Sequence, residues 1–190
     1  MGTSKGGVVN RVELEVKLNE GRNWLLMKYN GLSDEELRRP LTQSEHDPEN
    51  QWSALDHLAH MALVERNFNA MVRRHFEGSA NPVGLLNDDE GQPRTRAEIM
   101  KLVHAQTEAW QRDHHDDSFN EVVALTAAQR GKTLQLISQL SDAQLEETLP
   151  GAPWDDGTVG GVLSANADHG HMHWNWVTDA GLIEVSADSQ

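Results

Sequence analysis

The sequence predicts an all-α protein, an up-and-down four-helix bundle with short accessory helices. Three observations favour this class. Long segments repeat apolar residues at the period of a helix, several of them begin with a Ser or Thr that is followed three residues later by an acidic residue, and aromatic residues make up only 5% of the chain. The 190 residues are enough to bury a core within one domain, which we place at residues 8–182, between flexible termini at 1–7 and 183–190.

The first half of the chain is expected to hold two long helices. The first covers residues 8–29, although a run at 12–18 alternates apolar and charged residues as a strand would. We favour a helix there because the helical spacing continues through Leu14, Leu18, Gly21 and Leu25. A short helix at 33–39 and a polar loop at 42–51 follow. The second long helix covers 53–76 and is the most clearly amphipathic segment.

The second half is expected to continue the alternation of helices and loops. A loop at 79–94 contains two prolines and two glycines, and helices follow at 95–110 and 118–140. After a short acidic turn at 141–147 and another loop, the last long helix covers 158–180. No internal repeat or domain linker interrupts this order.

The charge and composition exclude several classes of function. The formal net charge is −14, whereas nucleic-acid and anionic-membrane surfaces need clustered Lys and Arg, so we expect neither partner. No apolar run approaches the roughly 20 residues that cross a bilayer. The chain has no cysteine and residues 1–7 lack the apolar stretch of a signal peptide, so we expect a cytoplasmic protein.

Three histidines form a candidate metal site. His169 and His173 are four residues apart on the last helix, where positions i and i+4 share one face, and His60 lies on the second long helix. Each is on a stripe that is expected to face the interior, where an imidazole without a partner costs about 1–3 kcal/mol. Three neutral imidazoles can hold a catalytic metal ion with one position left open. The alternative is that they are core histidines bonded to backbone or to one another.

Five neighbouring residues are expected to support this site or to line its pocket. His57 is a rival ligand one turn before His60. Asp56 either accepts the second ring proton of His60 or completes the helix cap at Ser53. The other three are expected as pocket residues: Trp52, Asn67 and Trp176.

Three short motifs resemble those of the DinB/YfiT-like superfamily of metal-binding four-helix-bundle proteins. They are W-S-A-L-D-H-L-A-H at residues 52–60, L-S-D-A-Q-L at 140–145, and H-G-H-M-H-W-N-W-V at 169–177. Their order and spacing are similar to the family's over about residues 8–182. The resemblance implies that the metal ligands are His60, His169 and His173.

The resemblance also implies an activity. Members of this superfamily include enzymes that depend on small thiols, such as bacillithiol transferases and mycothiol-dependent maleylpyruvate isomerase. The chain departs from the common pattern after the last ligand, where Trp174-Asn175-Trp176 replaces a frequent Arg-Gly-Gln.

We therefore expect a metal-dependent S-transferase or isomerase that acts on a small-molecule substrate. Its cofactors would be a divalent transition metal, zinc, nickel or iron, and a low-molecular-weight thiol. Because the chain has no cysteine, the reacting group at the metal would be an external thiolate or water rather than a protein thiol. Two alternatives are a metal-dependent hydrolase and a non-catalytic stress protein that binds a metal or a small molecule.

The first helix also predicts an assembly. Val12 and Val16 add a second apolar face to the stripe that contains Leu14, Leu18 and Leu25. A helix with so wide an apolar arc needs two partners, and members of the resembling superfamily commonly pair. We expect a two-fold homodimer.

Overall fold

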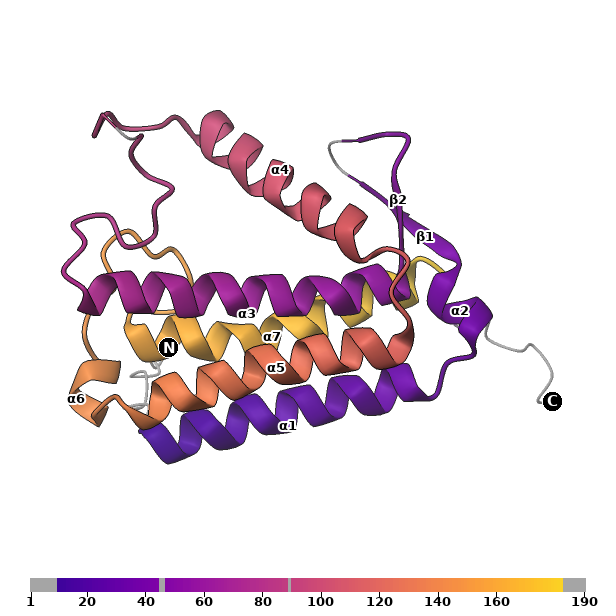
Figure 1. Ribbon diagram of the computed structural model, residues 1–190, viewed down its shortest axis with the longest axis horizontal. Helices are drawn as coiled ribbons and strands as arrows, with labels where there is room; N and C mark the ends of the chain where they lie inside the picture. Colours follow the sequence, from indigo (N-terminus) through magenta and orange to yellow (C-terminus); the bar gives the residue numbers. More distant parts are fainter. Residues whose placement is uncertain (1–9, 45–46, 89, 183–190) are drawn as a thin grey trace, which may run out of the picture.

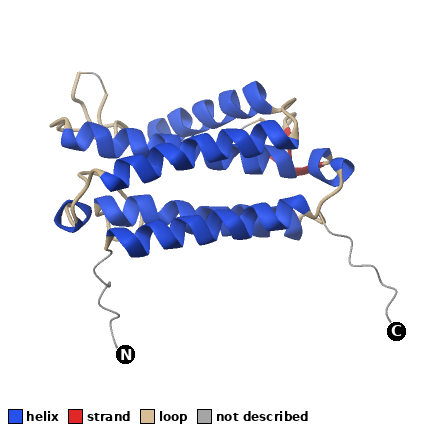
Figure 2. Cartoon of the chain, turned by 60° about the horizontal axis from the view of Figure 1, so that its bottom comes forward, coloured by secondary structure: helices blue, strands red, loops and turns tan. Residues whose placement is uncertain are grey.

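The computed structural model describes residues 10–44, 47–88 and 90–182, and nearly all of its regular structure is helix (Figure 2). The expected flexible termini, 1–7 and 183–190, lie outside the described residues, as does the expected start of the first helix at residue 8. The elements in chain order are α1 (Arg11–Asn30), α2 (Asp34–Arg38), β1 (Pro40–Gln43), β2 (Gln51–Ser53), α3 (Ala54–Phe76), α4 (Arg96–His114), α5 (Phe119–Ser138), α6 (Asp142–Leu145) and α7 (Val159–Asp179).

Four of the five long helices pack side by side around the core (Figure 1). α3 lies against α5 and α7, and α1 lies against the same two helices from the other side. Consecutive long helices alternate in direction along the chain. The described residues form helices and one two-stranded sheet, so the all-α class is confirmed. The fifth, α4, packs on α3 outside this group. It returns the chain to the end where α3 began, so that α5 runs parallel to α3 and α7 runs parallel to α1.

Local capping explains where the helices begin. In α3 the Ser53 hydroxyl accepts a hydrogen bond from the Asp56 backbone N–H, and the Asp56 carboxylate accepts one from the Ser53 N–H. The same reciprocal arrangement starts α4 at Thr95 and α5 at Ser118. It satisfies N–H groups that have no partner within the helix. None of the described helices is long and apolar enough to cross a membrane.

A short β-hairpin replaces part of the loop that was expected at residues 42–51. β1 and β2 pair antiparallel, with Thr42 opposite Trp52 and Gln43 opposite Gln51. The expectation of a loop was therefore wrong at both ends of this segment. Strands of four and three residues are too short to show the alternation of polar and apolar residues that identifies a strand in a sequence.

The stripe expected on α1 forms part of the core. Leu14, Leu18 and Leu25 are buried, and Gly21 lies so close to α7 that a Cβ atom there would be 3.1 Å from Cβ of Ala167. The residues of the second apolar face, Val12 and Val16, are 65% and 49% exposed.

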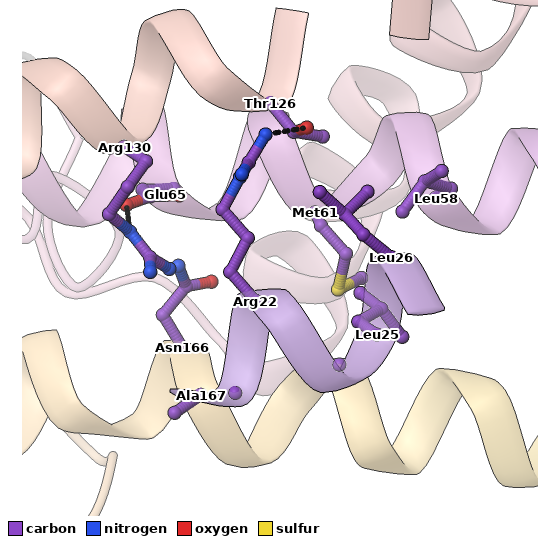
Figure 3. Close-up of a pocket in the computed structure, with 12 residues that line it drawn as sticks. Arg22, Leu25, Leu26, Leu58, Met61, Glu65, Thr126, Arg130, Asn166 and Ala167 are labelled. Carbon is purple, nitrogen blue, oxygen red and sulfur yellow. Dashed lines mark hydrogen bonds and ion pairs between the residues drawn. The ribbon is translucent and has the colours of Figure 1, made fainter. Parts of the chain in front are cut away.

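A buried polar group connects α1, α3 and α5 about halfway along their length, with Asn166 of α7 beside it (Figure 3). Nε of Arg130 donates to the Glu65 carboxylate at 2.6 Å, and Arg130 also donates to the backbone carbonyl of Leu18. Beside this ion pair is a cavity of about 30 Å³, which has room for one water molecule. The side-chain oxygen of Asn166 borders this cavity and has no hydrogen-bond partner among the described residues, so a water molecule there would satisfy it.

Candidate metal centre

The antiparallel contact between α3 and α7 brings the three predicted histidines together. His60 comes from the second turn of α3, and His169 and His173 come from the second half of α7. Their ring centroids are 4.6 to 5.6 Å apart. One nitrogen of each ring lies within 4.8 Å of the others, which is close enough for the three to hold a metal ion. Residues separated by more than a hundred positions in the chain therefore form one site.

Burial keeps these imidazoles neutral. It lowers the pKa of His169 to about 4, and together with the neighbouring histidines it lowers the pKa of His60 to about 3. Burial, followed by the charges of the other histidines, also lowers the pKa of His173 well below its usual value. At neutral pH each ring therefore has one unprotonated nitrogen, which is the form that binds a metal.

His173 lies at the centre of a chain of close nitrogen contacts. Its Nε2 is 3.1 Å from Nε2 of His169, and its Nδ1 is 2.7 Å from Nδ1 of His57. Nε2 of His57 is in turn 2.7 Å from Oγ1 of Thr42 on β1. By contrast, Nδ1 of His60 is buried and has no hydrogen-bond partner among the described residues.

His57 contacts His173 through Nδ1 and Thr42 through Nε2. It was considered as a rival ligand, but the ring nitrogens that lie within 4.8 Å of one another belong to His60, His169 and His173. Burial lowers its pKa to about 4, so it too is neutral. Thr42 was not expected to take part, because the hairpin that brings it to His57 was expected to be a loop.

Asp56 serves the helix cap and not the ring of His60. Its carboxylate accepts hydrogen bonds from the N–H and hydroxyl of Ser53, both at 2.7 Å. It also contacts the Gln111 amide at 3.2 Å and Nδ1 of His115 at 3.0 Å. The cap holds the carboxylate at the N-terminal end of α3, whereas His60 lies one turn further along. Gln111 and His115 were not expected here, since nothing near them in the sequence indicates a contact with α3.

A large cavity opens beside the histidines, between α3 and α4. Its volume is about 1050 Å³, at the upper end of the range for small-molecule sites and far more than a metal ion needs. In Figure 1, α4 lies close to α3 at its C-terminal end and diverges from it toward its N-terminal end. Nε1 of Trp110 fixes the close end by donating to the Ala59 carbonyl at 2.9 Å.

The three expected pocket residues all line this cavity. The ring of Trp52 lies 5.6 Å from that of His60, and the ring of Trp176 lies 4.6 Å from that of His173. The Asn67 amide donates to Oε1 of Gln106 on α4 at 3.0 Å. Trp176 is 47% exposed, so it lines the cavity and is also open to solvent.

Comparison with known proteins indicates the family and the fold of the chain. The family model of the DinB superfamily matches residues 17–177, a segment that includes all three histidines. The fold is similar to that of an uncharacterised protein from Escherichia coli UTI89, known from its crystal structure, with a TM-score of 0.53 and 19% sequence identity. That match covers 90% of this chain and 94% of the other. No curated protein matches the chain. Because the family model covers most of the sequence, the chain belongs to the DinB superfamily.

Proposed function

We propose that His60, His169 and His173 bind a divalent transition metal ion, zinc, nickel or iron, and that the protein is a metal-dependent S-transferase or isomerase using a low-molecular-weight thiol. The observation that carries this proposal is the convergence of three neutral imidazoles beside a cavity of about 1050 Å³. Such a cavity has room for a thiol and a second substrate together.

The residues present fit a metal ion. Imidazole nitrogens suit zinc, nickel and iron, and the three rings leave room for a ligand from the cavity. The buried Nδ1 of His60 supports the fit, because its lack of a hydrogen-bond partner costs free energy unless another group binds there. A metal ion that binds the lone pair of a ring nitrogen would offset the free-energy cost of burying that nitrogen.

The side chains around the histidines suit reactions of an external thiol. When bound, a divalent ion with three neutral ligands keeps its full charge and favours a thiolate over a thiol at neutral pH. Trp52 and Trp176 would hold an electrophile against the histidines and limit the access of water. The chain has no cysteine, so the sulfur must come from a small molecule.

His57 and Thr42 are positioning residues in this proposal. For Nε2 of His173 to bind a metal, the ring proton must be on Nδ1, from which it is donated to Nδ1 of His57. The proton of His57 is then on Nε2 and is donated to Oγ1 of Thr42. This order of donors and acceptors fixes the tautomer and the orientation of His173.

Removal of any one ligand should abolish metal binding. We expect tag-free wild-type protein to contain one metal ion per chain, and His60→Ala, His169→Ala and His173→Ala to contain almost none, measured by elemental analysis. His171→Ala is the matched control, because His171 lies on the same helix between two ligands but is exposed and stacks on Trp24. A wild-type protein that stays metal-free and gains no thermal stability from added zinc, nickel or iron would contradict the site.

Loss of the positioning residue His57 should weaken metal binding without abolishing it. In His57→Ala we expect the same stoichiometry at saturation and an affinity about 10–100-fold lower, measured by competition with a chelator. Thr42→Val should act in the same direction with a smaller effect. His115→Ala is the control, since this ring contacts Asp56 and not His173. Unchanged affinity in His57→Ala would exclude the positioning role.

Turnover with a panel of small thiols and electrophiles tests the activity. We expect product only when both thiol and metal are present, and no product in His173→Ala. Turnover that needs the metal but no thiol would indicate a hydrolase. Absence of turnover by metal-loaded protein across a broad panel would favour a non-catalytic binding protein.

We also propose that the chain forms a two-fold homodimer through the exposed face of α1. Val12 and Val16 are exposed on the same helix as the buried Leu14 and Leu18, and burying them against a second copy would remove apolar surface from water. Light scattering at micromolar concentration should give twice the mass of 21.2 kDa, and Val12→Asp/Val16→Asp should give a monomer. Leu102→Asp, at an exposed apolar position on α4, should remain dimeric. A wild-type monomer would contradict the proposal.

A further inference from the structure

The cavity extends well beyond the histidines along α3. Five residues of that helix lie on one stripe, at the spacing that returns a helix to the same face, and all of them line the cavity. They are His60, Val64, Asn67, Met71 and Arg74. Because a helix rises about 1.5 Å per residue, the first and the last of them are about 21 Å apart along its axis. The cavity is therefore a long channel with the histidines at one end and Arg74 at the other.

The middle of the channel is mainly apolar. α3 contributes one side, the segment that follows it contributes a second, and the diverging half of α4 contributes a third. Its apolar residues are Leu63, Val64, Phe68, Met71, Val83, Leu85, Met100, Val103 and Trp154. A surface of this kind binds an extended apolar molecule by removing it from water.

Arg74 places an uncompensated cation at the far end. It is the only Lys or Arg among the described residues that line the cavity. Its Nε donates to the Pro82 carbonyl at 2.7 Å and its Nη2 contacts the Val83 carbonyl at 3.5 Å. These carbonyls hold the guanidinium in place but do not neutralise it, and no carboxylate of the described residues forms an ion pair with it. A guanidinium fixed in this way is suited to binding a carboxylate.

The acidic residues of the channel lie away from this cation. Glu108 accepts hydrogen bonds from Ser44 and Asn50, both at 2.6 Å, which places it beside the hairpin at the histidine end. Asp179 is the last residue of α7, beyond His173. In the metal-free protein the channel therefore has negative charge at the histidine end and positive charge at the Arg74 end, and an anionic group is favoured only at the latter.

We propose that the channel binds an elongated, mainly apolar molecule with a carboxylate at one end, and that Arg74 binds this carboxylate. The distance between Arg74 and the histidines then requires the reacting group to be at the opposite end of the molecule. This inference rests on the proposed function for the reaction at the histidines, but the binding of the carboxylate does not depend on it.

Calorimetric titration of metal-free protein with dodecanoate and with dodecan-1-ol tests the proposal, because the two probes differ only in the head group. We expect wild-type protein to bind dodecanoate at least about tenfold more tightly than the alcohol, as charge-assisted hydrogen bonds predict. Arg74→Met should remove this difference and leave the affinity for the alcohol unchanged. Arg73→Met is the matched control, since Arg73 is the neighbouring residue, is exposed and does not line the channel, and it should keep the difference.

Several results would overturn the inference. They are equal affinities of wild-type protein for the two probes, no binding of either probe, an equal loss in Arg73→Met and Arg74→Met, and a preference for dodecanoate that survives in Arg74→Met. Arg74→Gln covers the possibility that Arg74→Met does not fold, because its amide can still donate to the Pro82 carbonyl while the charge is removed. It should lose the preference in the same way. Turnover plays no part in these measurements, so failure of the thiol-dependent reaction and failure of carboxylate binding are distinguishable.

Discussion

The antiparallel packing of α7 on α3 is the constraint on which the site depends. The candidate ligands come from these two helices alone, so their relative position is set by helix packing and not by a loop. Small residues let α7 approach its neighbours closely. A Cβ atom on Gly160 would lie 3.1 Å from the Leu145 carbonyl oxygen, and one on Gly170 would lie 3.2 Å from the side chain of Leu25. Larger residues there would shift α7 and with it the face that carries both histidines.

The position of α4 creates the cavity and leaves apolar side chains of α4 exposed to water. Its C-terminal half is tied to α3 by the Trp110 side chain and, through Gln111, to Asp56. Its N-terminal half stands away from α3 and leaves Met100 and Leu102 38% and 44% exposed. A helix fully packed on α3 would bury Met100, which lines the cavity, and would close the cavity. The position of α4 therefore keeps the space beside the histidines open.

Local features of the sequence predicted the helices and the histidine triad. The contacts that were not predicted join residues that are far apart in the sequence. The caps at Ser53, Thr95 and Ser118 involve residues three positions apart, so the sequence contains all the information they require. The stripe on α7 and the stripe on α3 were likewise sufficient to place three histidines on facing surfaces. The contact of His57 with Thr42 depends on a hairpin with very short strands, and the ion pair of Glu65 with Arg130 joins two helices far apart in the chain. The pattern of residues within a single segment cannot predict either contact.

Two explanations of the buried histidines, a metal site and a core of mutually bonded rings, differ in what they require of His60. Bonding among the rings can account for three of them without a metal, because a neutral imidazole has one donor and one acceptor. His173 can donate to His57 through Nδ1 and accept from His169 through Nε2, and His57 can donate to Thr42. The same account fails for His60, whose buried Nδ1 has no partner among the described residues although the ring lies 4.9 Å from that of His173. A structural core would gain from an apolar residue at this position, whereas a metal site needs an imidazole there. Mutual bonding of the histidines therefore leaves Nδ1 of His60 unsatisfied, and a metal ion or a water molecule bound there would satisfy it.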